Sequence, residues 1–420
     1  MPAHPEASDT NSAGHHAVSD PARMLEGVKV LDFTQYLAGP SCTRLLVELG
    51  AEVIKVELPT EGDPTRQIQP QRGGQSALSM QQNRGKRSVL LDLRRPETIE
   101  AIKRIVPQVD IVVENSTPGV MARKGLGYDV LSGINPGLIM VSVSGFGQTG
   151  RWSHRTCFDF IAQAVSGLMH LTGDPDGPPF FVGAGLGDTN AGVHAFAGVG
   201  YALYQRTRTG RGCHIDVCMV DALFHMQENA INAASVTDGA FRAIRQGRHY
   251  QPTSPAGTFK GPQGWIVVLC MPNQVPYLWA AMGRPDLATD ARFEEYYARI
   301  ENRAALTEII ESWMATFATD EEVLEVLEAH RVPCGPVLDP ADALTHPWFL
   351  EQGSVRSIRD TEGGTFMVPG FPLRFDGIRP APDVVPPRLG EHTVEVLGEL
   401  GFTAQEIATL TSTADAQVQS

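Results

Sequence analysis

The 420-residue sequence has no long hydrophobic run, no paired cysteine motif and no excess of basic residues. No apolar stretch reaches the roughly 18 residues that a membrane-spanning helix needs, so no such helix is predicted. Lys and Arg total 34 against 48 Asp and Glu, which gives a formal net charge of −14. Nonspecific binding to nucleic acid or to an anionic membrane needs a basic surface, so we expect neither partner. An anionic ligand would need a local basic pocket.

Cysteine is sparse, and its spacing forms no motif. The cysteines are scattered with no C-x-x-C pair, at Cys42, Cys157, Cys213, Cys218, Cys270 and Cys334. This spacing predicts reduced thiols, a cytoplasmic location and no structural metal site. Residues 1–24 are polar and have neither the basic start nor the apolar core of a signal peptide, so we predict a disordered tail there.

Strand-like and helix-like segments alternate from about residue 27. Strands are expected over 28–33, 52–57, 88–93, 111–114, 138–144 and 213–217, and helices over 40–49, 97–105, 159–171 and 189–206. Repeated β-α units predict an α/β fold, a doubly wound parallel sheet, in a large Rossmann-like domain over 25–225. A linker is expected over 226–255. Strand 265–270 and helices 277–282, 303–317 and 321–330 predict a smaller α+β domain over 256–365.

The most informative segment is GLGDTNAG (residues 185–192), a glycine-rich turn that holds one acid, Asp188. Helical spacing of apolar residues follows, which places Asp188 at the N-cap or in the first turn of a long helix. There the helix dipole should lower the pKa of its carboxyl group. An ionised carboxylate among glycines that admit a ligand suits a nucleophile. A lone aspartate in this position is more often only a helix cap, so the surrounding sequence has to decide.

Ordered blocks over roughly residues 25–410 resemble the class III CoA-transferase family, the group of formyl-CoA transferase and the carnitine CoA-transferases. The blocks are GVKVLDF (27–33), AGP (38–40), LGAEVIKVE (49–57), NRGKRS (83–88), VEN (113–115), the segment 159–167, RTRTGRG (206–212), VPCGPV (332–337) and LGEHT (389–393). Each block alone is a weak signal, but their number and order argue strongly against chance. In the family pattern, the aspartate that matches Asp188 is the catalytic nucleophile.

The resemblance implies a CoA-transferase that moves CoA from an acyl-CoA donor, expected to be succinyl-CoA, to a carboxylic acid. The reaction would pass through an aspartyl-CoA thioester on Asp188, with no permanently bound cofactor. The large domain would bind CoA, residues 366–420 would return to it, and two subunits would form an interlaced homodimer. The implied CoA contacts are Leu37, Ala38, Leu91, Asp92, Leu93, Arg94, Asn115, Ser116, Thr117, Arg123, Thr156, Cys157, Phe158 and Asp159.

Two sets of side chains keep open roles. Asp159, at the start of an expected helix, either orients reaction intermediates or only caps that helix. Four cations are candidates for binding a second carboxylate, although single surface cations are more often only solvated: His154, Arg155, Arg245 and Arg248.

The run GFGQTG (145–150) fits the dinucleotide-binding pattern G-x-G-x-x-G, but residues 151–156 lack the apolar spacing of a helix. We therefore expect a loop there and no bound dinucleotide.

Departures from formyl-CoA transferase bear on the substrate. This chain has Leu37 in place of a Gln, lacks a Trp near Gln67 and has SPAGT (254–258) in place of a glycine-rich loop. We therefore expect an acid larger than formate or oxalate. A 2-methylacyl-CoA racemase is the alternative, but Phe158 stands where that enzyme would have a proton-transferring His. A CoA-binding protein without turnover is the third hypothesis.

Overall fold

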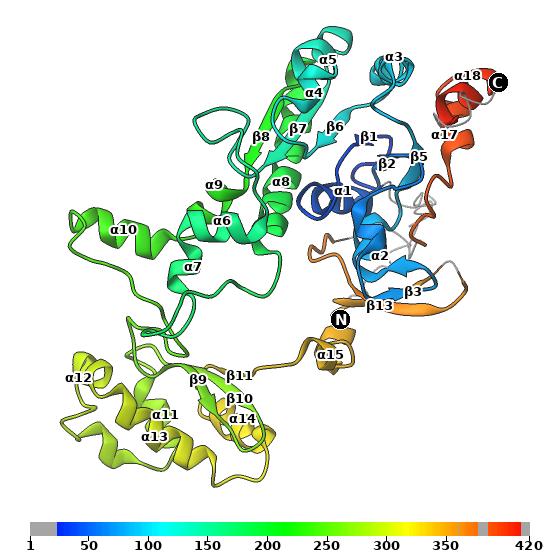
Figure 1. The fold of residues 1–420 in the computed structure, drawn as a ribbon. Coiled ribbons are helices and arrows are strands. Elements are labelled where there is room, and N and C mark those ends of the chain that lie inside the picture. The colour runs from blue at the N-terminus through cyan, green and yellow to red at the C-terminus, as the bar shows by residue number, and fades with distance from the viewer. Residues whose placement is uncertain (1–22, 361, 377–384, 413–420) are drawn as a thin grey trace, which may run out of the picture.

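The computed structural model describes residues 23–360, 362–376 and 385–412, so nearly all of the predicted tail lies outside the described residues. A six-stranded parallel sheet forms the centre of the large domain (Figure 1). Its strands are β1 (Lys29–Asp32), β2 (Glu52–Glu57), β5 (Arg87–Leu90), β6 (Ile111–Glu114), β7 (Ile139–Ser144) and β8 (His214–Cys218). The spatial order is β5-β2-β1-β6-β7-β8, which confirms the predicted α/β fold with a large parallel sheet.

The strand order reverses direction between β1 and β6. From β1 the chain builds outward through β2 to β5, and it then crosses back to pair β6 with the other side of β1, Asp32 opposite Val113. The loops that leave β1 and β6 therefore diverge, and a crevice opens at the carboxyl ends of these strands. This switch point positions the candidate site.

Helices cover both faces of the sheet, as the doubly wound pattern predicted. One face packs against α1 (Ala38–Glu48) and α8 (Leu186–Thr209) through a core that includes Val30, Val113 and Val141. The helices of the large domain also include α2 (Ala77–Asn83), α3 (Pro96–Ile105), α4 (Val120–Arg123), α5 (Tyr128–Ile134), α6 (Asp159–Ser166), α7 (Leu168–Leu171), α9 (Met219–His225) and α10 (Glu228–Val236). A second core on the opposite face includes Leu31, Val112 and Met140.

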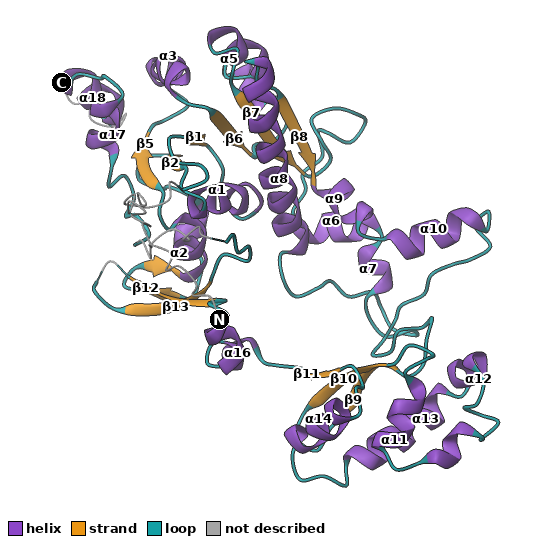
Figure 2. Cartoon of the chain, turned by 180° about the vertical axis from the view of Figure 1, so that it is seen from behind, coloured by secondary structure: helices purple, strands orange, loops and turns teal. Residues whose placement is uncertain are grey.

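A smaller α+β unit lies apart from the sheet in both views (Figure 2). It consists of an antiparallel sheet of β9 (Ala256–Lys260), β10 (Trp265–Leu269) and β11 (Cys334–Pro336), packed with α11 (Val275–Ala281), α12 (Tyr296–Glu301), α13 (Arg303–Met314) and α14 (Asp320–Ala329). Its own core includes Phe259, Ile266, Leu278 and Phe293. No helix among the described residues is both long and apolar enough to span a membrane.

The chain returns to the large domain after β11. It passes through α15 (Pro340–Ala343) and α16 (Pro347–Glu351) into a hairpin of β12 (Val355–Arg359) and β13 (Thr365–Pro369). Arg356 of this hairpin donates from Nη1 to Glu48 Oε2 on α1 (2.9 Å). The predicted domain boundary at residue 365 thus falls inside a hairpin that contacts the large domain.

The last helices cover the outer edge of the sheet. They are α17 (Thr393–Glu399) and α18 (Ala404–Thr411). In the part of the chain that the structure describes, no strand pairs with the outer edge of β5. Backbone groups of β5 bond to this segment instead: Ser88 N donates to His392 Nδ1 (3.2 Å), and Leu90 N donates to Thr393 Oγ1 (3.1 Å). His392 N in turn donates to Ser88 O (3.0 Å).

The structure differs from the predicted helices in two places near the site. The helix expected over 159–171 is broken into α6 and α7 at Gly167, which has φ +91° and ends α6 in a left-handed conformation. Helix α8 starts at Leu186, earlier than the Thr189 expected, so Asp188 lies within its first turn. The run 145–150 is a loop, as expected.

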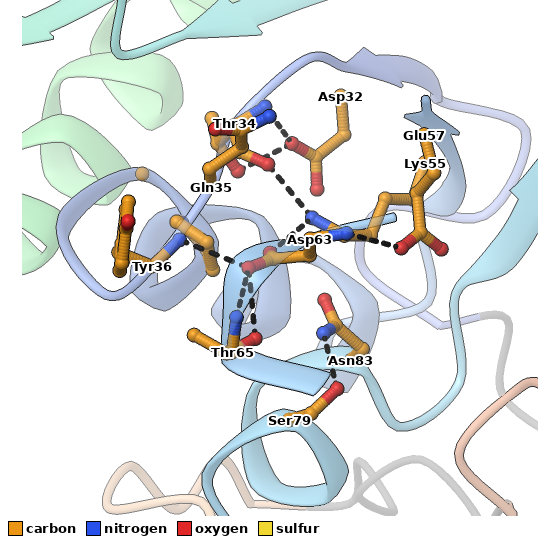
Figure 3. A network of polar contacts seen from close by, with 12 residues as sticks. Asp32, Thr34, Gln35, Tyr36, Lys55, Glu57, Asp63, Thr65, Ser79 and Asn83 are labelled. Atoms are coloured by element: carbon orange, nitrogen blue, oxygen red, sulfur yellow. Dashed lines mark hydrogen bonds and ion pairs between the residues drawn. The ribbon is translucent and has the colours of Figure 1, made fainter. Parts of the chain in front are cut away.

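A buried ionic network supports the loop after β1 (Figure 3). Lys55, fully buried on β2, donates from Nζ to Thr34 O (2.7 Å) and forms an ion pair with Asp63 Oδ2 (3.0 Å). The other oxygen of Asp63 accepts from Thr65 N (2.9 Å) and from Tyr36 N (3.3 Å). Tyr36 has a left-handed φ of 62°, which few non-glycine residues adopt, so these contacts hold a strained backbone turn.

Asp32 joins the same network from the end of β1. Its carboxylate forms an ion pair with the buried Lys86 (3.0 Å) and accepts from Thr34 N (2.8 Å). Burial would raise the pKa of Asp32, but the charges of Lys86 and Lys55 and the Thr34 hydrogen bonds outweigh it and hold that pKa at about 2. The carboxylate therefore stays ionised wherever the protein is folded near neutral pH.

We predict that Lys55→Met destabilises the fold by about 3–5 kcal/mol, because it leaves Asp63 buried without its counterion. Asp63 Oδ2 relies on that ion pair alone. Urea unfolding measures the change. Lys103→Met is the control: it removes a lysine from an exposed pair with Glu100 and should cost at most about 0.5 kcal/mol. A loss in Lys55→Met no larger than in the control would contradict the prediction.

Candidate functional site

The loops after β1 and β6 meet at the switch point and are joined by reciprocal hydrogen bonds. Gln35 N donates to Asn115 Oδ1 (2.9 Å), and Asn115 Nδ2 donates to Gln35 O (2.8 Å). Both ends of the Asn115 amide are therefore used to fix the backbone. A cavity of about 360 Å3 opens at this edge of the sheet, where open α/β folds bind their ligands.

The cavity brings together predicted site residues from distant segments of the chain. Those that line it are Ala38, Leu93, Asn115, Ser116, Thr117, Thr156, Cys157, Phe158 and Asp188. Sequence analysis missed other lining residues: Phe33, Gln35, Tyr36, Pro118, Val143, Ser144, Gly145 and Met219. Many of these lie at or just after the carboxyl ends of β1, β6, β7 and β8. Placing those strands side by side in the sheet would have identified them.

The remaining predicted contacts lie outside the cavity lining. Leu91 packs in the core, and the carboxylate of Asp92 is paired with Arg94 (2.8 Å). Arg123 is exposed as the last residue of α4 and does not line the cavity. Leu37 packs behind the glycine that precedes α8.

Asp188 lies in the first turn of α8 with its side chain toward the cavity. No hydrogen bond from any described residue reaches its carboxylate, which leaves both oxygens free. Gly145 and Cys157, which both line the cavity, lie very close together. A Cβ on Gly145 would lie only 2.0 Å from Cys157 Cβ, so no larger residue fits at position 145. The thiol of Cys157 has its pKa raised to about 11 by burial and by the charge of Asp188, so it stays protonated and neutral.

Asp159 caps a helix other than its own. It is the first residue of α6, but its Oδ1 accepts from Gly187 N (2.5 Å) and Asp188 N (3.2 Å) in the first turn of α8. Its Oδ2 accepts from Gln163 Nε2 (2.6 Å). Asp159 therefore fixes the backbone that carries Asp188, and it occupies two amides that would otherwise be available to a substrate oxygen.

The predicted direction of the Asp188 pKa is wrong. Burial raises the pKa of Asp188 to about 6, and the neighbouring negative charge of Asp159 adds to the rise. The helix dipole was expected to lower it, but the two first-turn amides nearest Asp188 already donate to Asp159. Burial and a second carboxylate thus outweigh the dipole.

Of the four candidate cations, only Arg155 lines the cavity with Asp188. Arg245 donates to the carbonyl oxygens of Asp174 (3.0 Å) and Pro175, and Arg248 is paired with Glu311 in the small domain. His154 is exposed and does not line the cavity. Among the described residues, no group of three or more His, Cys, Asp or Glu side chains is placed to hold a metal ion.

Comparison with known proteins agrees with this arrangement. The model of CoA-transferase family III matches residues 25–393. The succinyl-CoA–D-citramalate CoA-transferase of Chloroflexus aurantiacus is 36% identical over 394 residues, 93% of this chain and 97% of that protein. The acetyl-CoA:oxalate CoA-transferase of Acetobacter aceti is 39% identical over 359 residues, 85% of this chain and 90% of that protein.

The fold is shared as well. The crystal structure of a CAIB/BAIF family protein from Brucella suis matches with a TM-score of 0.80 and 34% sequence identity, over 90% of this chain and 100% of that one. The family model and the structural match each cover most of the chain. The chain therefore belongs to CoA-transferase family III, and it is a CoA-transferase.

Proposed function

We propose that this enzyme transfers CoA from succinyl-CoA to a dicarboxylic acid, with Asp188 as the nucleophile. One observation carries the proposal: a carboxylate with a raised pKa, which accepts no hydrogen bond from any described residue, lies in a cavity at the sheet's switch point. A pKa of about 6 leaves the group ionised at neutral pH, yet makes it a stronger base than an ordinary aspartate.

Each step of the reaction exchanges one acyl bond for another. Asp188 attacks the thioester carbonyl of the donor, which gives an aspartyl mixed anhydride and CoA thiolate. The thiolate attacks the aspartyl carbonyl, so the donor acid leaves and an aspartyl-CoA thioester remains. The acceptor carboxylate then attacks this thioester and releases the thiolate, forming a second anhydride. Attack of the thiolate on the acceptor carbonyl yields the new acyl-CoA and regenerates Asp188.

The chain supplies positioning rather than a proton. None of these steps needs proton transfer, because carboxylates and thiolate are the nucleophiles and leaving groups throughout. Asp159 acts as a positioning residue by holding the first turn of α8. The phenyl ring of Phe158, in edge contact with Tyr36 (6.0 Å between ring centroids), cannot carry a proton, which argues against racemisation at an α-carbon.

The substrate class rests on the relatives. Succinyl-CoA is named as the donor of one, and the acceptor acids D-citramalate and oxalate of the two are both dicarboxylic. The relatives therefore do not decide the size of the acceptor, and the expectation of an acid larger than oxalate stays a prediction.

The cytoplasmic location also stays a prediction, which rests on the six free cysteines.

A second copy of the chain is proposed to cover an apolar face of α8. Tyr201 and Tyr204 on this helix are 77% and 65% exposed, beside an apolar hollow of about 410 Å3 lined with Leu46 and Phe196. Contiguous exposed aromatic residues of this kind mark protein interfaces more often than solvated surface. Homodimerisation would bury them; how the two chains are interlaced remains a prediction from the family resemblance.

We predict a homodimer at micromolar concentration by analytical ultracentrifugation. The double variant Tyr201→Lys, Tyr204→Lys should shift the protein toward monomer, because two buried charges would face the partner without counterions. Tyr297→Lys, at a residue 75% exposed in the small domain, is the matched control and should remain dimeric. A monomeric wild type, or a double variant as dimeric as the control, would disprove this interface.

We predict that Asp188 becomes covalently modified. Wild-type protein incubated with succinyl-CoA and hydroxylamine should carry a hydroxamate on the peptide containing Asp188, seen by mass spectrometry, because hydroxylamine intercepts an aspartyl thioester or anhydride. Asp188→Ala should lose CoA transfer almost completely. Unmodified Asp188 during turnover, or wild-type rates in Asp188→Ala, would sink the proposal. Incorporation of solvent deuterium at the α-carbon without an acceptor acid would favour the racemase alternative.

We predict that kcat/KM falls as the pH drops through about 6, because protonation removes the Asp188 nucleophile. Asp159→Asn should move this acid limb to lower pH, since it removes the negative charge that helps raise the Asp188 pKa. The amide oxygen can still accept from Gly187 N, so the fold should persist. Asp176→Asn, at an exposed residue, removes the same charge elsewhere and should leave the profile in place. An unshifted limb in Asp159→Asn would refute the coupling.

A further inference from the structure

One cation in the cavity has no partner assigned by the chemistry above. Arg155 lines the same cavity as Asp188, on the loop between β7 and α6. Among the described residues that line it, Arg155 is the basic side chain and Asp188 the acidic one, and the others are neutral. The protein as a whole carries a net charge of −14, so this basic side chain lies in a cavity of a predominantly acidic protein.

The guanidinium of Arg155 is held in place without using its hydrogen-bond donors. Its central carbon lies 4.4 Å from the ring centroid of Trp152, and Trp152 packs edge-on against Phe146 at 5.6 Å. No described residue accepts a hydrogen bond from this guanidinium or pairs with it. A guanidinium stacked on an aromatic face keeps its N–H groups, which lie in its plane, free to bind a planar anion in bidentate fashion.

Electrostatics in the cavity limit which acids can enter. An ionised acceptor acid approaches a site that already holds the Asp188 carboxylate. A dicarboxylic acid brings two negative charges, and only one of them takes part in the exchange of acyl bonds. The second needs a cation at a distance from Asp188, and a paired charge is far less costly to place in a cavity than an unpaired one.

We propose that Arg155 binds the distal carboxylate of a dicarboxylic acyl group, on the donor and on the acceptor alike, and so selects dicarboxylic over monocarboxylic acids. This inference rests on the proposed function. The phosphates of CoA are the other anions available. A long pantetheine arm separates them from the thioester, whereas Arg155 lines the same cavity of about 360 Å3 as Asp188, which is at the small end of ligand pockets.

The test compares substrates that differ only in the terminal carboxylate. Donors are succinyl-CoA against butyryl-CoA, and acceptors are glutarate against valerate, each measured as kcat/KM by chromatography of the CoA esters. Arg155→Met should lower the preference for the dicarboxylic member about 10- to 100-fold in both pairs, a loss limited by the exposure of Arg155 to solvent. Arg155→Lys should fall between, since it keeps the charge but loses bidentate geometry. Arg151→Met, on the same loop outside the cavity lining, is the control for charge alone and should keep the wild-type preference.

The outcomes separate this inference from the proposed function. If the wild type transfers CoA to no acid, the proposed function fails. If it transfers CoA but shows no dicarboxylic preference, or if Arg155→Met keeps that preference, only the role of Arg155 is wrong. An equal rise in KM for succinyl-CoA and butyryl-CoA in Arg155→Met would instead place the guanidinium on the coenzyme and overturn the inference.

Discussion

The contact between Lys55 and the loop after β1 is the constraint on which the site depends. One fully buried ammonium group holds the Thr34 carbonyl oxygen and the Asp63 carboxylate at the same time. Through Asp63 it fixes Tyr36 in its left-handed conformation. Gln35, which lies between Thr34 and Tyr36, is hydrogen-bonded to Asn115 on the loop after β6. Two walls of the cavity thus follow from a charge that never meets the substrate. An apolar residue could fill the same volume, but it could not dictate the direction of a backbone turn.

The two acids near the start of α8 illustrate a related division: Asp188 is the proposed nucleophile, and Asp159 holds the backbone that carries it. The Asp188 carboxylate accepts no hydrogen bond from any described residue and is partly desolvated, which raises the free energy of its ionised form. The Asp159 carboxylate accepts from two backbone amides and from the side chain of Gln163. These two neighbouring aspartates therefore have different tasks: one carboxylate is left free to react, and the other holds the backbone. Their environments set these tasks, since the residue type is the same. Helix α8 also packs closely on α1, where a Cβ on Gly192 would lie 2.7 Å from Ala38 O.

The sequence predicted those features that depend on local residue patterns or on the family resemblance. The sheet, its strands and the first-turn position of Asp188 followed from periodicity and glycine placement. The direction of the Asp188 pKa did not, because it depends on burial and on Asp159, which is 29 residues away along the chain. Tyr36 and Met219 were missed for the same reason: each reaches the cavity only because parallel strands end at one edge. Arg155 could be listed from sequence among equivalent cations, but only the fold separates it from Arg245 and Arg248.

The covering of β5 by the C-terminal segment has a consequence for how the protein is made. The backbone amides of Ser88 and Leu90 find their acceptors in His392 and Thr393, about 300 residues later in the chain. A ribosome delivers the sheet and the whole small domain before it delivers that cover. For most of synthesis the large domain therefore presents an open strand edge, which is a template for pairing with other chains. Truncation before His392 would leave that edge open permanently, because the chain can close it only after this last segment has been made.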